Sequence, residues 1–143
     1  MQILRVELCG IGPYTGTESI DFQALGADGL FLLEGPTGSG KTTIIDAIVF
    51  ALYGQVSGAE SSNDRLASTH LEPGTSPYVE LVVDTSRGLY RVRRSPRHER
   101  AKKRGSGTTT ENPRIMLWKL SDPSDTEGAA VSSNIQDATG ELR

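Results

Sequence analysis

Alternation of apolar and polar residues predicts several strands along this chain. Five segments show it, namely residues 1–8, 17–22, 78–85, 89–94 and 115–120. The turn at Ser86-Arg-Gly88 makes residues 78–94 a predicted hairpin. A sixth segment, Gly29–Glu34, is a continuous apolar run, the pattern of a buried strand.

One long helix is predicted between Lys41 and Tyr53. Its apolar residues recur at spacings of one, three and four, and Gly54 ends it. Five or six strands against one strong helix predict an α/β lobe, with a mixed or antiparallel sheet packed on that helix.

Three segments lack such a pattern. Residues 55–77 are polar, with a short helix predicted near 64–69. Residues 95–114 are basic and then rich in Gly and Thr, which predicts a mobile loop. From Ser121 the chain has few large apolar residues, so we expect order to fade toward Arg143.

Length and composition indicate one domain of 143 residues. The sequence contains no apolar run of membrane-spanning length and no signal-peptide pattern at its start, so we expect no membrane partner. Its single cysteine, Cys9, cannot form an internal disulfide or a zinc site by itself. We therefore expect a reducing, cytoplasmic location.

The net charge of −3 conceals a strongly basic segment. Nine cations and one anion between Arg87 and Arg104 give it +8, against −11 for the rest of the chain. A local excess of this kind favours a polyanionic partner.

The residues from Gly35 to Thr42 fill every fixed position of a phosphate-binding loop. They are Gly35, Pro36, Thr37, Gly38, Ser39, Gly40, Lys41 and Thr42. Glycines let backbone N–H groups approach phosphate oxygens, and the helix that follows presents its positive end to them. Lys41 is expected to place its charge on the β- and γ-phosphates, Thr42 to bind Mg²⁺, and Thr43 to reach the α-phosphate. A glycine-rich turn without a ligand is the alternative.

Hydrolysis also needs an acidic residue at the end of a second strand, to hold Mg²⁺ and orient water. The nearest candidate is Asp84, at the end of Leu81-Val82-Val83. It lies in a predicted antiparallel hairpin, so we interpret it as a solvated strand end. The chain is therefore expected to bind nucleotide and to be catalytically incomplete.

The phosphate loop, the helix ending Asp46-Ala-Ile-Val-Phe-Ala-Leu-Tyr-Gly54 and the strand Tyr90-Arg-Val-Arg-Arg-Ser95 together resemble the SbcC family. Members are the ATPase subunits of the SbcCD nuclease and are related to SMC-type ATPases. The resemblance runs from Met1 to about Leu120. It implies the N-terminal lobe of a split ABC-type ATPase head over residues 1–120, with residues 121–143 leading toward a glutamine loop and coiled coil.

The same resemblance implies a set of ligands and partners. The cofactors are ATP and Mg²⁺. The partners are an SbcD-like nuclease subunit, the chain's own C-terminal lobe, a second head in a homodimer, and double-stranded DNA. Its ATPase activity belongs to the full-length protein, and the isolated lobe is expected to be inactive.

Two further segments are implicated by the resemblance. The turn at Gly12-Pro13-Tyr14 passes the nucleotide, although several relatives have a basic residue where this chain has Gly12. Ala67, Ser68 and Thr69 align with a segment beside the nucleotide, with an ordinary polar loop as the alternative. Tyr14 is a candidate for stacking on adenine or for the core.

Cations in the basic segment are candidates for contacts with the phosphates of DNA, without reading of bases. They are Arg97, Arg100, Lys102, Lys103 and Arg104. A solvated charged face is the alternative. Two other functions remain open: a chromosome-organising or recombination-mediator ATPase of SMC type without a nuclease, and a small-molecule kinase, which a parallel sheet would favour.

Overall fold

The computed structural model describes residues 1–26, 32, 34–36, 40–56, 66–69 and 71–142. A six-stranded sheet in the order β2-β1-β3-β4-β7-β8 dominates it, and all neighbouring pairs are antiparallel. The predicted α/β class with an antiparallel sheet is confirmed. The strands are β1 (Gln2–Ile11), β2 (Tyr14–Asp21), β3 (Tyr78–Thr85), β4 (Gly88–Ser95), β7 (Arg114–Leu120) and β8 (Ala129–Ser132).

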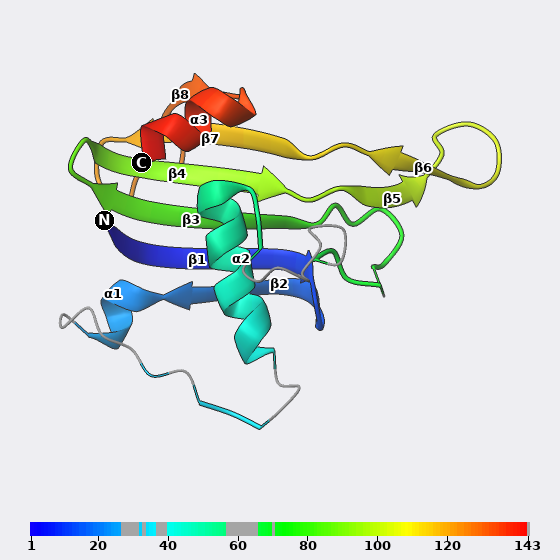
Figure 1. The fold of residues 1–143 in the computed structure, drawn as a ribbon, viewed down its shortest axis with the longest axis horizontal. Coiled ribbons are helices and arrows are strands. Elements are labelled where there is room, and N and C mark those ends of the chain that lie inside the picture. The colour runs from blue at the N-terminus through cyan, green and yellow to red at the C-terminus, as the bar shows by residue number, and fades with distance from the viewer. Residues whose placement is uncertain (27–31, 33, 37–39, 57–65, 70, 143) are drawn as a thin grey trace.

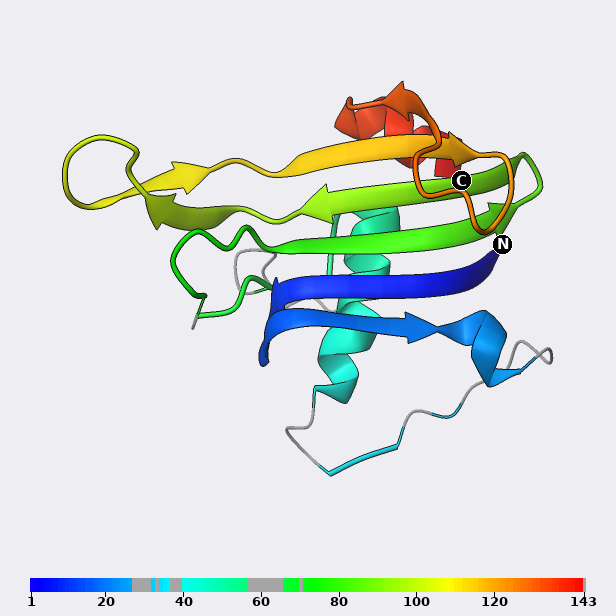
Figure 2. The same ribbon diagram turned by 180° about the vertical axis from the view of Figure 1, so that it is seen from behind.

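The two longer helices, α2 (Lys41–Tyr53) and α3 (Ile135–Leu142), lie on the same face of this sheet (Figure 1). A single-turn helix, α1 (Phe22–Leu25), follows β2. From behind, no helix of the described residues covers the other face (Figure 2). No helix of the described residues is long and apolar enough to cross a membrane.

The main core lies between the sheet and α2. Ala47, Phe50 and Ala51 of α2 are at most 2% exposed and belong to the same buried cluster as Val6 and Leu81 of the sheet. Strand residues alternate between the two faces. On the face away from α2, Leu4, Val82 and Leu120 form a second, smaller buried cluster. Packing in the main core fixes the direction of α2 across the strands.

The prediction of a mobile loop over residues 95–114 is wrong. Residues His98–Ala101 form β5 and Thr108–Glu111 form β6, a separate two-stranded hairpin that projects beyond the sheet (Figure 1). It continues the β4–β7 pair, and the ladder is interrupted where Pro96 and Pro113 lack the N–H needed for it.

The predicted loss of order after Ser121 is also wrong. The Asp125 carboxylate accepts backbone N–H groups of Ser121, Glu127 and Gly128, and these bonds lower the pKa of Asp125 to about 2. This turn leads into β8, and α3 then buries Ala138 and Leu142 in the main core. Few apolar residues suffice here because local hydrogen bonds shape the chain.

The buried strand predicted over Gly29–Glu34 lies mostly outside the described residues. Leu32 and Glu34 are described, and they belong to no strand; Leu32 is 85% exposed. An apolar strand needs a backbone partner and a covering layer, and the described residues provide neither at this position. The short helix predicted near 64–69 is not present at 66–69, where Ala67 instead pairs with Ile11.

Candidate functional site

The phosphate loop ends where α2 begins. Gly40 precedes the helix with φ +91°, and a Cβ there would lie 2.4 Å from the Tyr14 hydroxyl, so only glycine fits. The Lys41 ammonium donates to the Gly35 carbonyl oxygen, and the Thr42 side chain is exposed. Thr37, Gly38 and Ser39 lie outside the described residues.

The turn between β1 and β2 contacts the first turn of α2. Gly12 has φ +53°, and a Cβ there would lie 2.6 Å from Thr43 Cγ2. A basic residue at this position would therefore displace the start of α2.

Residues 66–68 line the other side of this turn. The Gly12 N–H donates to the Leu66 carbonyl at 2.9 Å, and the Ser68 N–H donates to the Gly10 carbonyl at 2.8 Å. Ser68 is buried and Thr69 is exposed. Gly12, Thr43 and the segment at Ala67 are thus brought together around this turn. Tyr14 is partly buried against the main core, with its hydroxyl at the helix start.

These features can be compared with known proteins. A family described as "AAA domain" matches residues 5–138. The chain belongs to this AAA domain family.

Three curated relatives are each named as the C subunit of the SbcCD nuclease. The protein of Vibrio cholerae is 38% identical over 120 residues, covering 84% of this chain and 12% of the relative. The protein of Treponema pallidum is 42% identical over 96 residues, covering 66% of this chain and 9% of the relative. The protein of Lactococcus lactis is 33% identical over 117 residues, covering 82% of this chain and 11% of the relative. The resemblance to the SbcC family is confirmed, and this AAA domain spans about a tenth of the length of these relatives.

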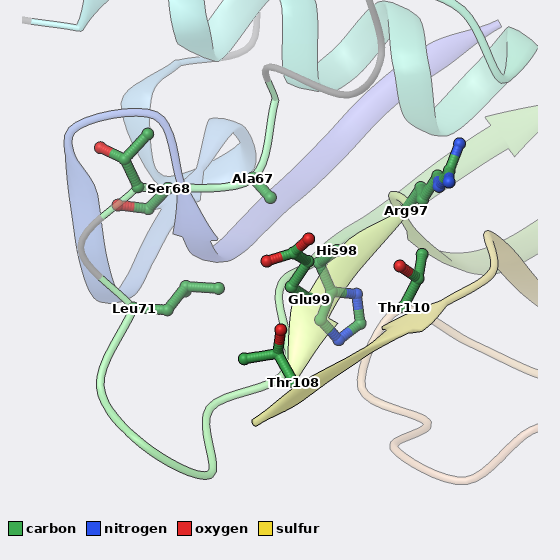
Figure 3. Close-up of a pocket in the computed structure, with 9 residues that line it drawn as sticks. Ala67, Ser68, Leu71, Arg97, His98, Glu99, Thr108 and Thr110 are labelled. Carbon is green, nitrogen blue, oxygen red and sulfur yellow. The ribbon is translucent and has the colours of Figure 1, made fainter. Parts of the chain in front are cut away.

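A cavity of about 680 Å³ separates residues 67–69 and Leu71 from the β5–β6 hairpin (Figure 3). Arg97, Glu99 and two threonines line its hairpin side, with Ala67, Ser68 and Leu71 opposite. His98 Nδ1 lies 3.0 Å from the Pro96 carbonyl oxygen, and Nε2 is buried with no partner among the described residues. Arg97 therefore borders this cavity, apart from the cations at the hairpin turn.

The basic segment is dispersed over several surfaces of the AAA domain. Arg100 pairs with Glu111, as does Arg114, and their hydrogen bonds lower the pKa of Glu111. The remaining cations of the hairpin are exposed at its turn and form no ion pair within the described part of the chain. They are Lys102, Lys103 and Arg104.

The sheet face without helices carries a charged cluster that the sequence did not reveal. The Glu80 side chain is 7% exposed and lies 2.8 Å from Arg93 Nε, 3.5 Å from Arg5 Nη2 and 4.0 Å from Arg91 Nε. Arg91 also stacks over Trp118 and Arg93 over Tyr78. Glu80 thus offsets part of the charge of the three strand arginines. An acidic residue inside an otherwise apolar strand pattern was the available signal.

Asp84 lies at the far end of the sheet from the phosphate loop. Asp84 pairs with Gln2, at the start of β1. Gly12, which contacts Thr43 at the start of α2, follows the other end of β1. β1 has ten residues, so nine steps of about 3.4 Å separate its two ends by roughly 31 Å. Among the described residues, no group of three His, Cys, Asp or Glu side chains is placed to hold a metal.

Proposed function

We propose that this chain is the nucleotide-binding N-terminal lobe of an SbcC-like ATPase that uses ATP to control an SbcD-like nuclease subunit on DNA. The observation that carries the proposal is the start of α2 at Lys41, held against the turn at Gly12 and the segment 66–68. The names of the curated relatives support the nuclease partner.

The residues present fit a magnesium nucleotide. A side chain is excluded at Gly40, so the backbone at the start of α2 can approach phosphate oxygens closely. The Lys41 ammonium donates to the Gly35 carbonyl in this structure and would instead contact the β- and γ-phosphates of a bound nucleotide. The Thr42 hydroxyl is exposed and would bind Mg²⁺. Gly35, Pro36, Thr37, Gly38, Ser39 and Thr43 complete the proposed site, and Ala67, Ser68 and Thr69 border it. Bound Mg²⁺ would offset negative charge on the phosphates.

A second lobe is part of the proposal because α2 is apolar on both sides. Ile45 and Tyr53 of α2 are 53% and 46% exposed, on the side away from the sheet. A helix that is apolar all round belongs between two layers. We assign the second layer to the chain's own C-terminal lobe, with two such heads forming a homodimer around ATP and residues 121–143 leading toward that lobe.

Of the alternative functions, the small-molecule kinase would need parallel strands. Every strand pair among the described residues is antiparallel, which does not favour it. A chromosome-organising or recombination-mediator ATPase would share the proposed nucleotide site. The names of the relatives favour the nuclease-linked function.

Isothermal titration with Mg-ATP tests the nucleotide site. We expect weak binding, because one lobe supplies half of the site. We expect turnover at background, because Asp84, the nearest candidate for the acidic strand end, lies at the far end of the sheet. Absence of binding by folded protein would refute the site. Rapid turnover by this chain alone would refute the need for a second lobe.

Binding of duplex DNA by the hairpin is tested by replacing Arg97, Arg100, Lys102, Lys103 and Arg104 with Ser. Affinity should fall similarly for unrelated sequences, and the salt dependence should flatten by about 0.9 log units for each phosphate that is no longer neutralised. Fluorescence anisotropy at several salt concentrations measures both quantities. Because Arg100 already pairs with Glu111, the three cations of the turn should account for most of the change.

Arg87→Ser is the matched control for the hairpin variants. Arg87 is an exposed cation next to the β3–β4 turn and pairs with Glu141 at 3.4 Å, far from the hairpin. Its removal should leave the salt dependence unchanged. An unchanged slope in the five-residue variant would show that the hairpin cations are only solvated.

A further inference from the structure

Arg94 is a buried cation on the helix side of the sheet. It is 3% exposed, whereas Arg91 and Arg93 of the same strand face the other side. No carboxylate among the described residues forms an ion pair with it. Burial lowers the pKa of Arg94 to about 10, so the side chain stays charged at neutral pH. A charge in this position needs other partners to offset its desolvation.

Those partners come from two helices. Arg94 Nε donates to the Ala51 carbonyl at 3.1 Å, one of the last four carbonyls of α2, which have no partner within the helix. The negative end of the α2 dipole therefore faces the guanidinium. A side chain at Gly54, just beyond the helix, would lie 2.9 Å from Arg94 Nη1, so this glycine leaves room for it.

The second helix is α3. Arg94 Nη2 donates to the Thr139 hydroxyl at 3.0 Å, and that hydroxyl donates to the Ile135 carbonyl at 2.6 Å. The Thr139 hydroxyl thus accepts a hydrogen bond from Arg94 and donates one to its own helix. Because α3 otherwise reaches the core through Ala138 and Leu142, Arg94 is its polar connection to α2.

We propose that Arg94 is a positioning residue that joins the end of α2 to α3, so that the two helices open and close together. Separating either helix from Arg94 would leave a buried charge short of a partner, and that cost couples the two contacts. The link extends to nucleotide binding if the proposed function holds, because α2 carries Lys41 about 20 Å away at its other end. Binding of a nucleotide at the phosphate loop would then also stabilise α3.

Hydrogen exchange followed by mass spectrometry tests the link without any ligand. Thr139→Val removes the hydroxyl at nearly constant shape and leaves the bond from Arg94 to Ala51. We expect exchange to accelerate about tenfold in residues 135–142 and also in the last turn of α2, the size typical of losing a hydrogen bond to a charged group. Acceleration confined to α3 would overturn the proposal.

Asp137→Ala is the matched control. Asp137 lies exposed in the first turn of α3 and stabilises the positive end of that helix. Its loss should accelerate exchange in α3 and leave α2 unchanged. Equal acceleration of α2 would mean that any loosening of α3 disturbs α2, which would overturn the specific role of Arg94. Arg94→Lys, which retains the charge without the planar fork, should resemble Thr139→Val.

Added Mg-ATP separates this proposal from the nucleotide site. In the unaltered chain, Mg-ATP should slow hydrogen exchange in both α2 and α3. In Thr139→Val, it should slow exchange in α2 only. Protection of α2 without α3 in the unaltered chain would overturn the link. If Mg-ATP protects neither helix, the proposed nucleotide site fails, and the ligand-free comparison still decides whether Arg94 couples the helices.

Discussion

Lys41→Ala is expected to abolish measurable binding of Mg-ATP. The ammonium group donates to the Gly35 carbonyl, within the loop that is proposed to surround the phosphates. Alanine removes the charge on the β- and γ-phosphates and at least one charge-assisted hydrogen bond, a loss of about 3 kcal/mol or more. Since each ~1.4 kcal/mol is a factor of ten, a weak half-site falls below detection by isothermal titration.

Lys119→Ala is the control for this variant. It removes one ammonium from β7, where Lys119 Nζ lies 5.8 Å from the centre of the Tyr90 ring. The change in net charge is the same, so any general electrostatic effect appears in both variants. Equal affinities of Lys41→Ala and the unaltered chain, with both folded by circular dichroism, would discard the assignment of the phosphate loop.

Glu80→Ala is expected to destabilise the fold by about 3 kcal/mol. The substitution leaves Arg5, Arg91 and Arg93 facing one another without their shared carboxylate. Breaking a buried ion pair typically costs ~3–5 kcal/mol, and we expect the lower end because the Arg5 and Arg93 side chains are 40% and 43% exposed. Urea denaturation measures the free energy of unfolding.

Two variants separate this effect from others. Glu80→Gln preserves the shape and removes the charge, so it should lose most of the same free energy. Glu99→Ala removes an exposed carboxylate that forms no ion pair among the described residues and should change stability by less than about 0.5 kcal/mol. A cost below about 1 kcal/mol for Glu80→Ala would show that solvent already screens the three arginines.

Regular patterns made much of the fold predictable. Alternation located β1, β3, β4 and β7, and the helical spacing with Gly54 located α2 with both its ends. The hairpin β5–β6 was missed because Thr and charged residues on a solvated ribbon give no apolar alternation. The ending β8–α3 was missed because Asp125 and Arg91 organise it through backbone contacts that a hydropathy pattern cannot show.

In the candidate site too, some features follow from the sequence pattern and others depend on the fold. The spacing from Gly35 to Thr42 predicted the phosphate loop, since each position has its own chemical requirement. The steric conflict at Gly12 and the pairing of Ala67 with Ile11 depend on contacts between distant segments. Strand alternation explains why Arg94 lies on the face opposite Arg91 and Arg93, but its partners on α2 and α3 depend on the fold.

The pairing of β1 with β3 has a consequence for folding during synthesis. Arg5 and Glu80 lie side by side although 75 positions separate them in the chain. At roughly 5–20 residues per second, β1 waits on the order of 4–15 s on the ribosome for its central neighbour, with only the β2 hairpin formed. Such distant pairing also slows folding, because a large loop must close before the two strands can meet. The nascent β1–β2 ribbon, with one edge of β1 unpaired until β3 is made, is therefore the stage at which this chain is most open to chaperones and to aggregation.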